Sequence, residues 1–176
     1  RDVTGVQTCA LPIFDGTHLR RFVDQPRRAE QTNFDIVAEN LRRAATIRIR
    51  AVDQFDPRLG GLIRGLEQTL VGQCDGNIYL TPPGSAGFPP HFDTTDVFVV
   101  QCAGRKHWRI FEQYANMTEL PPMESGWEPG RFEPTSKPRE LALDKGDVLH
   151  LPRGVMHSAH CTDRESMHLK IGRAHV

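Results

Sequence analysis

The chain has 176 residues, with 22 lysines and arginines against 22 aspartates and glutamates, so its formal net charge is zero. This length suits one domain around one core, and the balanced charge gives no general attraction to nucleic acid or to an anionic membrane. No apolar run is long enough to cross a bilayer. The scattered cysteines Cys74, Cys102 and Cys161 form no CxxC pair, which indicates free thiols in a reducing, cytoplasmic compartment rather than a zinc knuckle or disulfides.

Both ends of the chain resemble translated sequencing adapter. The first segment contains VTGVQTCALPI and the last reads IGRAHV. We can write a DNA sequence that encodes the last segment and take its reverse complement. That reverse complement lies within a DNA sequence that encodes part of the first segment. We therefore expect residues 1–13 and 171–176 to be adapter-derived and to pack against little. Phe14 and Lys170 would be read from hybrid codons, and 14–170 would hold one incomplete domain.

Two helices and a strand are predicted in the first half of the chain. Residues 33–45 (NFDIVAENLRRAA) carry apolar side chains at helical spacing, with Asn33 as the N-cap. Residues 46–52 (TIRIRAV) alternate as a half-buried strand does. Asp56 before a proline opens a second helix over 56–70. Its apolar stripe predicts core packing rather than a binding surface; the stripe consists of Leu59, Leu62, Ile63, Leu66 and Leu70.

From Asn77 onward short apolar runs alternate with glycine and proline turns. One strand is predicted to stop at Gly104, the next to follow as KHWRIF, and later strands to include LAL, DVLHLP and one that opens near His157. Short strands at such intervals predict a β-sandwich or a barrel-like roll. The interruption from Tyr114 to Arg139 is too long for an ordinary connection, so it is either disordered or a functional lid.

A metal-binding pattern is formed by His91, Asp93 and His157. Residues two apart on a strand point to the same face, so the first imidazole and the carboxylate can reach one ion. His157, on a later strand, would complete a set of two histidines and one carboxylate. Such a set leaves three adjacent coordination positions open, as non-haem Fe(II) oxygenases require. Taken alone, HxD is a weak signal because a surface histidine often lies two residues from an aspartate by chance.

The surroundings of these residues carry a family resemblance. Residues 77–111 (NIYLTPPGSAGFPPHFDTTDVFVVQCAGRKHWRIF) and 143–159 (LDKGDVLHLPRGVMHSA) resemble the JmjC-type cupin oxygenases known as ribosomal oxygenases. In that family the first histidine follows a PPG…PPH loop, and the second comes five residues after a proline, as His157 does after Pro152. The resemblance covers about Ala44–Leu169. It implies a mainly β fold with flanking helices, a double-stranded β-helix (jelly-roll or cupin) truncated on its C-terminal side.

The resemblance also implies the cofactors and their ligands. His91, Asp93 and His157 would bind Fe(II), with 2-oxoglutarate as cosubstrate and O2 as the second substrate. Lys106 matches the basic residue that pairs with the distal carboxylate of 2-oxoglutarate in the family. Strand parity puts Trp108 on the same face as Lys106, which indicates that this face is covered.

Further positions near the cosubstrate are less distinctive. Asn77 matches a polar residue that lies there in the family, and Tyr79 shares its strand face. The family usually has threonine or serine where Lys170 stands, and the adapter explains that difference. His160 is close in sequence to His157, but its odd offset places it across the strand. We expect four histidines to be structural or on the surface: His107, His150, His160 and His168.

By this resemblance the chain is a 2-oxoglutarate-dependent dioxygenase that hydroxylates a side chain of a protein substrate, such as a ribosomal protein. The whole protein would be a homodimer through a C-terminal region missing here. Two alternatives stay open. A cupin enzyme that uses no 2-oxoglutarate tends to present more histidines and a glutamate, whereas a catalytically silent β-roll would serve as a binding module. Four acidic residues in the long interruption would suit a basic partner: Glu119, Glu124, Glu128 and Glu133.

Overall fold

The structure is a computed structural model that describes residues 13–14, 19–20, 31–112 and 133–173. Most of the predicted interruption from Tyr114 to Arg139, including three of its four glutamates, lies outside the described residues. The elements in chain order are β1 (Ile13–Phe14), β2 (Leu19–Arg20), α1 (Gln31–Arg42), β3 (Thr46–Ile49), a 3-10 turn (Val52–Gln54), α2 (Pro57–Leu70), β4 (Cys74–Thr81), β5 (Asp96–Phe111), β6 (Arg139–Asp144), β7 (Val148–Leu151), β8 (Met156–His160) and β9 (Ser166–Arg173).

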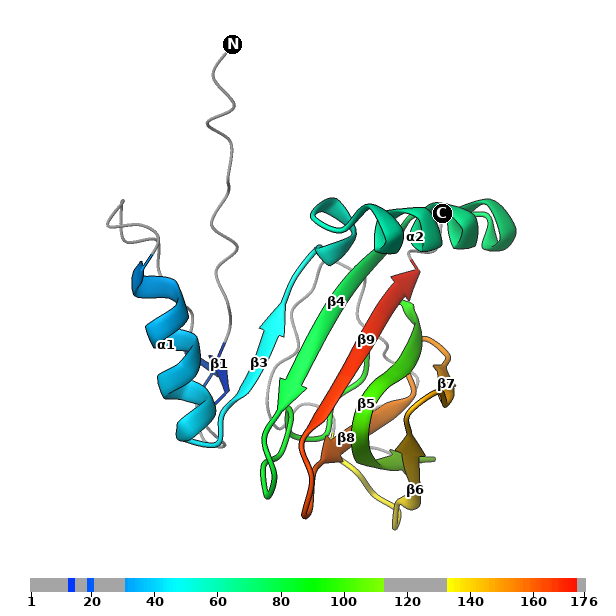
Figure 1. The fold of residues 1–176 in the computed structure, drawn as a ribbon. Helices are drawn as coiled ribbons and strands as arrows, with labels where there is room; N and C mark the ends of the chain where they lie inside the picture. Colours follow the sequence, from blue (N-terminus) through cyan, green and yellow to red (C-terminus); the bar gives the residue numbers. More distant parts are fainter. Residues whose placement is uncertain (1–12, 15–18, 21–30, 113–132, 174–176) are drawn as a thin grey trace.

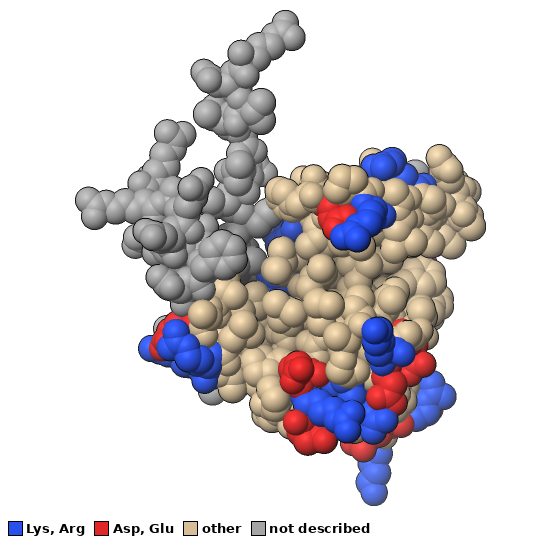
Figure 2. All heavy atoms as spheres, viewed as in Figure 1, with Lys and Arg blue, Asp and Glu red and all other residues tan. Residues whose placement is uncertain are grey.

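The described strands form one sheet in the order β2-β1-β3-β4-β9-β5-β6, and β7 and β8 also pair with β5. The sheet curls into a half-barrel, with α2 across the end of β4 and β9 (Figure 1). This architecture confirms the predicted mainly β, jelly-roll fold with flanking helices. Neither α-helix in the described part of the chain is long and apolar enough to span a membrane. Figure 2 shows acidic and basic side chains intermingled on this face of the molecule, in keeping with the balanced charge.

The first helix differs from its prediction at both ends. α1 begins at Gln31, so Asn33 lies inside the helix and its prediction as the N-cap is wrong. The helix ends at Arg42 because Ala44 adopts a left-handed conformation with φ of 60°, from which the chain enters β3. The predicted strand over 46–52 is likewise shorter, since β3 ends at Ile49 and a 3-10 turn follows.

The second helix is capped as predicted. The carboxylate of Asp56 accepts hydrogen bonds from the backbone N–H groups of Arg58 and Leu59 at 2.8 and 3.3 Å, which satisfies two donors of the first turn. Ile63 is buried and packs with residues of the sheet, whereas Leu62 is 46% exposed. The predicted apolar stripe is therefore wrong at Leu62, which faces solvent.

The long strand β5 joins the two halves of the roll. The predicted stop at Gly104 is wrong, because the chain continues from Asp96 to Phe111 without leaving the strand. A register shift lies between Gln101 and Ala103, and Gly104 follows with a φ of +65°. A Cβ at Gly104 would lie 1.8 Å from the carbonyl oxygen of Glu165. Glycine therefore allows β5 to approach the backbone at Glu165 closely, at the point where β5 passes from its β9 and β7 partners to β6 and β8.

Alternation along β9, and along β5 on either side of its register shift, separates two packed faces. Leu169 and Ile171 of β9 pack in the cluster under α2 together with Ile63. Val97 and Trp108 of β5 belong to a second cluster inside the roll. His168 and Lys170 alternate with Leu169 and Ile171 along β9, so they face the opposite, concave side of the sheet.

The C-terminal strand corrects one expectation about the ends of the chain. β9 runs to Arg173 and lies between β4 and β5, so the sheet has its central strand and residues 171–173 are part of it. Ile171 is 1% exposed and pairs with Phe98 and Gly76. The expectation that this segment packs against little is wrong, because its apolar residue continues the alternation of β9. At the other end Ile13 and Phe14 form the two-residue strand β1 beside β3, and residues 1–12 lie outside the described part.

Candidate metal centre

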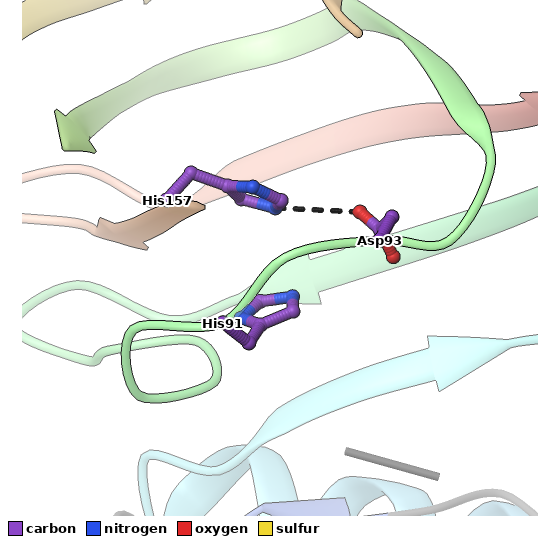
Figure 3. A group of neighbouring side chains, drawn as sticks. All are labelled: His91, Asp93 and His157. Atoms are coloured by element: carbon purple, nitrogen blue, oxygen red, sulfur yellow. Dashed lines mark ion pairs between the residues drawn. The ribbon is translucent and has the colours of Figure 1, made fainter. Parts of the chain in front are cut away.

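The structure brings His91, Asp93 and His157 together on the concave side of the roll (Figure 3). Each offers one ligand atom, and these atoms lie within 4.8 Å of one another. His91 and Asp93 lie on the connection between β4 and β5 rather than on a regular strand, and His157 belongs to β8. Two backbone hydrogen bonds, of 3.0 and 2.7 Å, join His91 to His157. This bridge fixes the spacing of the two imidazoles.

Both imidazoles are oriented by a backbone carbonyl group that lies next to one ring nitrogen. Nδ1 of His91 lies 2.8 Å from the carbonyl oxygen of Pro89, and Nδ1 of His157 lies 2.9 Å from that of Val155. A carbonyl oxygen only accepts, so each Nδ1 is the protonated donor and each Nε2 keeps its lone pair. Burial lowers the pKa of His91 and lowers that of His157 to about 3. Both rings are therefore neutral at physiological pH, as metal ligation requires.

Asp93 supplies the anionic ligand. Burial alone would raise its pKa, but Lys170 and the two imidazoles outweigh that effect and hold it at about 2. Its Oδ2 atom lies 3.5 Å from Nε2 of His157 and is buried without a hydrogen-bond partner. A buried carboxylate oxygen without a partner costs free energy unless a cation binds it. Two neutral imidazole nitrogens and one carboxylate oxygen are the ligand set of a non-haem Fe(II) centre, so the residues fit that metal.

Lys170 forms a contact that the sequence did not indicate. Its Nζ lies 2.6 Å from Oδ1 of Asp93, and the two side chains are 16% and 22% exposed. Burial would lower the pKa of Lys170, but Tyr79 and Asp93 outweigh it and the pKa is raised. The ammonium group therefore neutralises Asp93 in the metal-free protein. Sequence parity places Lys170 on the concave face, but nothing local identifies its partner 77 residues away.

Lys106 is the most deeply buried cation of the described chain, with 1% exposure. Its Nζ donates a hydrogen bond to Oγ1 of Thr81. Burial lowers its pKa to about 8, and no carboxylate of the described residues forms an ion pair with it. Trp108, 4% exposed, lies on the same strand face and its ring lies 5.8 Å from that of His157. The covered face predicted from Trp108 is present, with a buried positive charge that fits a carboxylate ligand.

Tyr79 and Asn77 lie side by side on β4, opposite β9. Tyr79 is 6% exposed, and its ring stacks on that of His168 at 4.9 Å. Asn77 pairs with Lys170 in the sheet, while its amide nitrogen donates to Oδ2 of Asp75 at 2.6 Å. Tyr79 thus packs within the concave face, whereas the Asn77 amide bonds along its own strand.

The remaining histidines divide between the two faces. His107 and His160 stack on each other at 5.4 Å, and His107 alternates with the inward-facing Lys106 and Trp108. His168, expected to be structural or on the surface, is buried at 3% exposure beside Tyr79. Its even offset from Lys170 on β9 was the available signal for its place on the concave face.

Comparison with known proteins agrees with this geometry. The profile of the JmjC domain matches residues 61–176. Ribosomal oxygenase 1 of Danio rerio is 34% identical over 127 residues, which cover 72% of this chain and 23% of that protein. The bifunctional lysine-specific demethylase and histidyl-hydroxylase NO66 of Caenorhabditis briggsae is 34% identical over 143 residues, which cover 77% of this chain and 18% of that protein. The chain thus spans less than a quarter of the length of these relatives.

Solved structures show the same fold. YcfD of Escherichia coli superposes with a TM-score of 0.57 at 23% identity, over 75% of this chain and 34% of that one. A structure of YcfD in complex with cobalt and 2-oxoglutarate superposes with a TM-score of 0.53 at 23% identity, over 75% of this chain and 32% of that one. The resemblance to JmjC-type oxygenases is confirmed, and the profile match covers well over half of the sequence. This chain belongs to the JmjC domain family.

Proposed function

We propose that this domain is an Fe(II)- and 2-oxoglutarate-dependent oxygenase that hydroxylates a side chain of a protein, such as a ribosomal protein. The observation that carries the proposal is the group of His91, Asp93 and His157 on the concave face that also buries Lys106. A metal-ligand set with an unpaired buried cation beyond it suits a ligand with two anionic ends. 2-Oxoglutarate is such a ligand, since its keto acid chelates a metal and its distal carboxylate is free.

The three ligands would hold iron and leave adjacent positions for the keto acid and O2. Iron, once bound with both, supplies the oxidising power that inserts one oxygen atom into a C–H bond while 2-oxoglutarate becomes succinate and CO2. The protein's own contribution is positional. The carbonyl groups of Pro89 and Val155 keep the imidazole Nε2 atoms turned toward the ion, which fixes the centre before substrate arrives.

Lys106 would select and orient the cosubstrate. A buried ammonium without a counter-ion is costly, and burial accordingly lowers its pKa to about 8. A distal carboxylate beside it would provide the missing charge, raise that pKa and keep the lysine protonated. Thr81, which accepts from Nζ, holds the ammonium in place for this contact.

A polypeptide substrate is supported by the names of the relatives, one a ribosomal oxygenase and another a histidyl-hydroxylase. Because this chain covers only a fraction of those proteins, substrate choice belongs to the proposal. Incubation of the protein with Fe(II), 2-oxoglutarate and purified ribosomal proteins should yield succinate and add the mass of one oxygen atom to a specific side chain. The Asp93→Ala variant is the matched control and should form neither product.

The same assay, repeated with small metabolites in place of the ribosomal proteins, separates the alternatives. A cupin enzyme without 2-oxoglutarate chemistry would consume a small metabolite while forming no succinate. A silent binding module would retain a protein partner unmodified. Succinate formation without any modified polypeptide, together with turnover of a small metabolite, would reject the protein-hydroxylase proposal.

A further inference from the structure

His168 is a buried histidine whose ring nitrogen Nδ1 has no hydrogen-bond partner. The residue is 3% exposed and is the third residue of β9. An imidazole nitrogen buried without a partner is uncommon and destabilises the folded state. The binding of a ligand next to it would explain why a polar ring rather than an apolar one occupies this position.

The ring of His168 is held firmly in place by two aromatic neighbours. It stacks on Tyr79 with centroids 4.9 Å apart and planes 4° from parallel. Trp108 meets it edge to face at 5.6 Å and 68°. With two aromatic rings packed against it, the imidazole offers a fixed direction for a hydrogen bond, which favours binding because little side-chain entropy is lost.

Pairing across β4 and β9 places His168 between the two ends of the proposed site. Lys170, the residue that contacts Asp93, lies two positions along β9 in one direction. Two positions in the other direction lies Ser166, which pairs with Thr81, the acceptor for Lys106. Two residues of a strand span about 6.6 Å. His168 therefore faces the space between the metal ligand Asp93 and the buried ammonium of Lys106.

Charge around the ring indicates what it can bind. Burial lowers the pKa of His168 well below its usual value, and Lys106, Lys170 and His157 lower it further. The ring is thus neutral and has one N–H to donate. Lys106 and Lys170 are cations and cannot accept a hydrogen bond from this N–H group, and His157 is another imidazole that is assigned to the metal. A carboxylate ligand is suited, because it accepts hydrogen bonds and is attracted by the same cations.

We propose that His168 is a binding residue of the cosubstrate site, donating a hydrogen bond from Nδ1 to the distal half of 2-oxoglutarate beside Lys106. This inference rests on the proposed function. Trp108, whose ring contacts that of His168, lies two residues from Lys106 on the same face of β5, which is why the distal carboxylate rather than the metal-bound keto acid is the expected acceptor.

Calorimetry on the Mn(II)-loaded protein tests the assignment with two ligands. Pyruvate shares the keto-acid end of 2-oxoglutarate and lacks the distal carboxylate. His168→Leu should bind 2-oxoglutarate about 10- to 100-fold more weakly, equivalent to about 1.4–2.8 kcal/mol, while its affinities for pyruvate and Mn(II) stay unchanged. His168→Asn, whose amide nitrogen can occupy a position close to Nδ1, should restore most of the affinity for 2-oxoglutarate. The exposed His150, changed to leucine, is the matched control.

A second variant guards against a loss of packing. His168→Phe keeps an aromatic ring between Tyr79 and Trp108 and removes the polar atom, so it should reproduce the selective loss. Unchanged binding of 2-oxoglutarate by folded His168→Phe or His168→Leu would overturn the inference. An equal loss for pyruvate and 2-oxoglutarate would also overturn it, because that pattern indicates general disruption. If the unmodified protein binds Mn(II) but no 2-oxoglutarate, the proposed function itself fails.

Discussion

Replacing Lys170 by methionine should strengthen metal binding and, at the same time, destabilise the metal-free protein. Nζ of Lys170 lies 2.6 Å from Oδ1 of Asp93, so the ammonium group contacts an oxygen at the position where a metal ion is needed. Both side chains are largely shielded from water, at 16% and 22% exposure. Methionine keeps the length and most of the apolar stem of lysine and removes only the charge.

The size of the effect follows from the partial burial of this pair. Breaking a fully buried pair by removing one partner costs about 3–5 kcal/mol, whereas an exposed pair contributes about 0–1 kcal/mol. An intermediate value of about 1–3 kcal/mol is therefore expected for the loss of unfolding free energy in metal-free Lys170→Met. A metal ion has to displace the same contact in the unmodified protein. Its affinity in the variant should rise by about 5- to 150-fold, at about 1.4 kcal/mol per tenfold.

Cobalt(II) titration, followed by visible absorption and calorimetry, measures the affinity, and urea denaturation in a chelator measures the stability. Lys145→Met, at an exposed lysine between β6 and β7, is the control and should change neither quantity. Lys170→Thr, which introduces the residue type usual in the family, should also bind metal more tightly than the unmodified protein. An unchanged metal affinity in Lys170→Met, or a rise in both affinity and metal-free stability, would refute the reasoning.

Three further results are expected. Lys106→Ala should weaken 2-oxoglutarate binding by about a hundred- to several-thousand-fold and leave Mn(II) binding intact. If calorimetry showed the same affinity for 2-oxoglutarate as in the unmodified protein, another residue would have to bind its distal carboxylate. The unfolding free energy of the metal-free protein should fall between pH 6.5 and pH 3, because burial lowers the pKa of His157 from 6.5 to about 3 and only the unfolded chain takes up the proton there. In His157→Asn the unfolding free energy, measured by urea denaturation at a series of pH values, should depend less on pH. An unaltered slope of unfolding free energy against pH would contradict this assignment. Gly104→Ala should lower the free energy of unfolding by more than about 2 kcal/mol, because its Cβ would lie 1.8 Å from the Glu165 carbonyl oxygen. Gly61→Ala in α2, whose Cβ would have nothing within 4 Å, should leave the free energy of unfolding unchanged or raise it. Equal stabilities of the two variants would argue against the close approach.

Local sequence patterns predicted the start of α2 at Asp56–Pro57, because the cap and the proline both act within one turn. The N-cap predicted for α1 at Asn33 was wrong. At Gly104 the same local reasoning failed. A glycine after an apolar run reads as a strand end, but this glycine is needed for a contact with Glu165, 61 residues later, and no local pattern reveals that contact.

The candidate site shows the same division between local motif and tertiary contact. His91, Asp93, His157 and Lys106 were predicted because the segments around them resemble those of the ribosomal oxygenases, and the structure places all four on the concave side. His168 stands in no such motif. Its proposed role depends on Tyr79 and Trp108 packing against its ring, a contact between three strands that requires the register of the sheet.

The adapter-like origin of residues 171–173 stays a prediction, but their expected lack of packing was wrong for a physical reason. Ile171 falls on the same face as Leu169, so any apolar residue there would continue the strand and enter the cluster under α2. Alternation with period two is easily satisfied over three residues. A short segment of unrelated origin can therefore complete a strand whose neighbours already set its register.

A crystal structure of the protein grown without oxygen, with Fe(II) and 2-oxoglutarate, tests the central claim most directly. The account predicts one metal ion bound by Nε2 of His91, Nε2 of His157 and a carboxylate oxygen of Asp93 at about 2.0–2.2 Å, with Lys170 displaced from Asp93. The keto acid should chelate that ion, and its distal carboxylate should contact Lys106. Iron bound elsewhere, or 2-oxoglutarate bound with Lys106 still unpaired, would contradict the account.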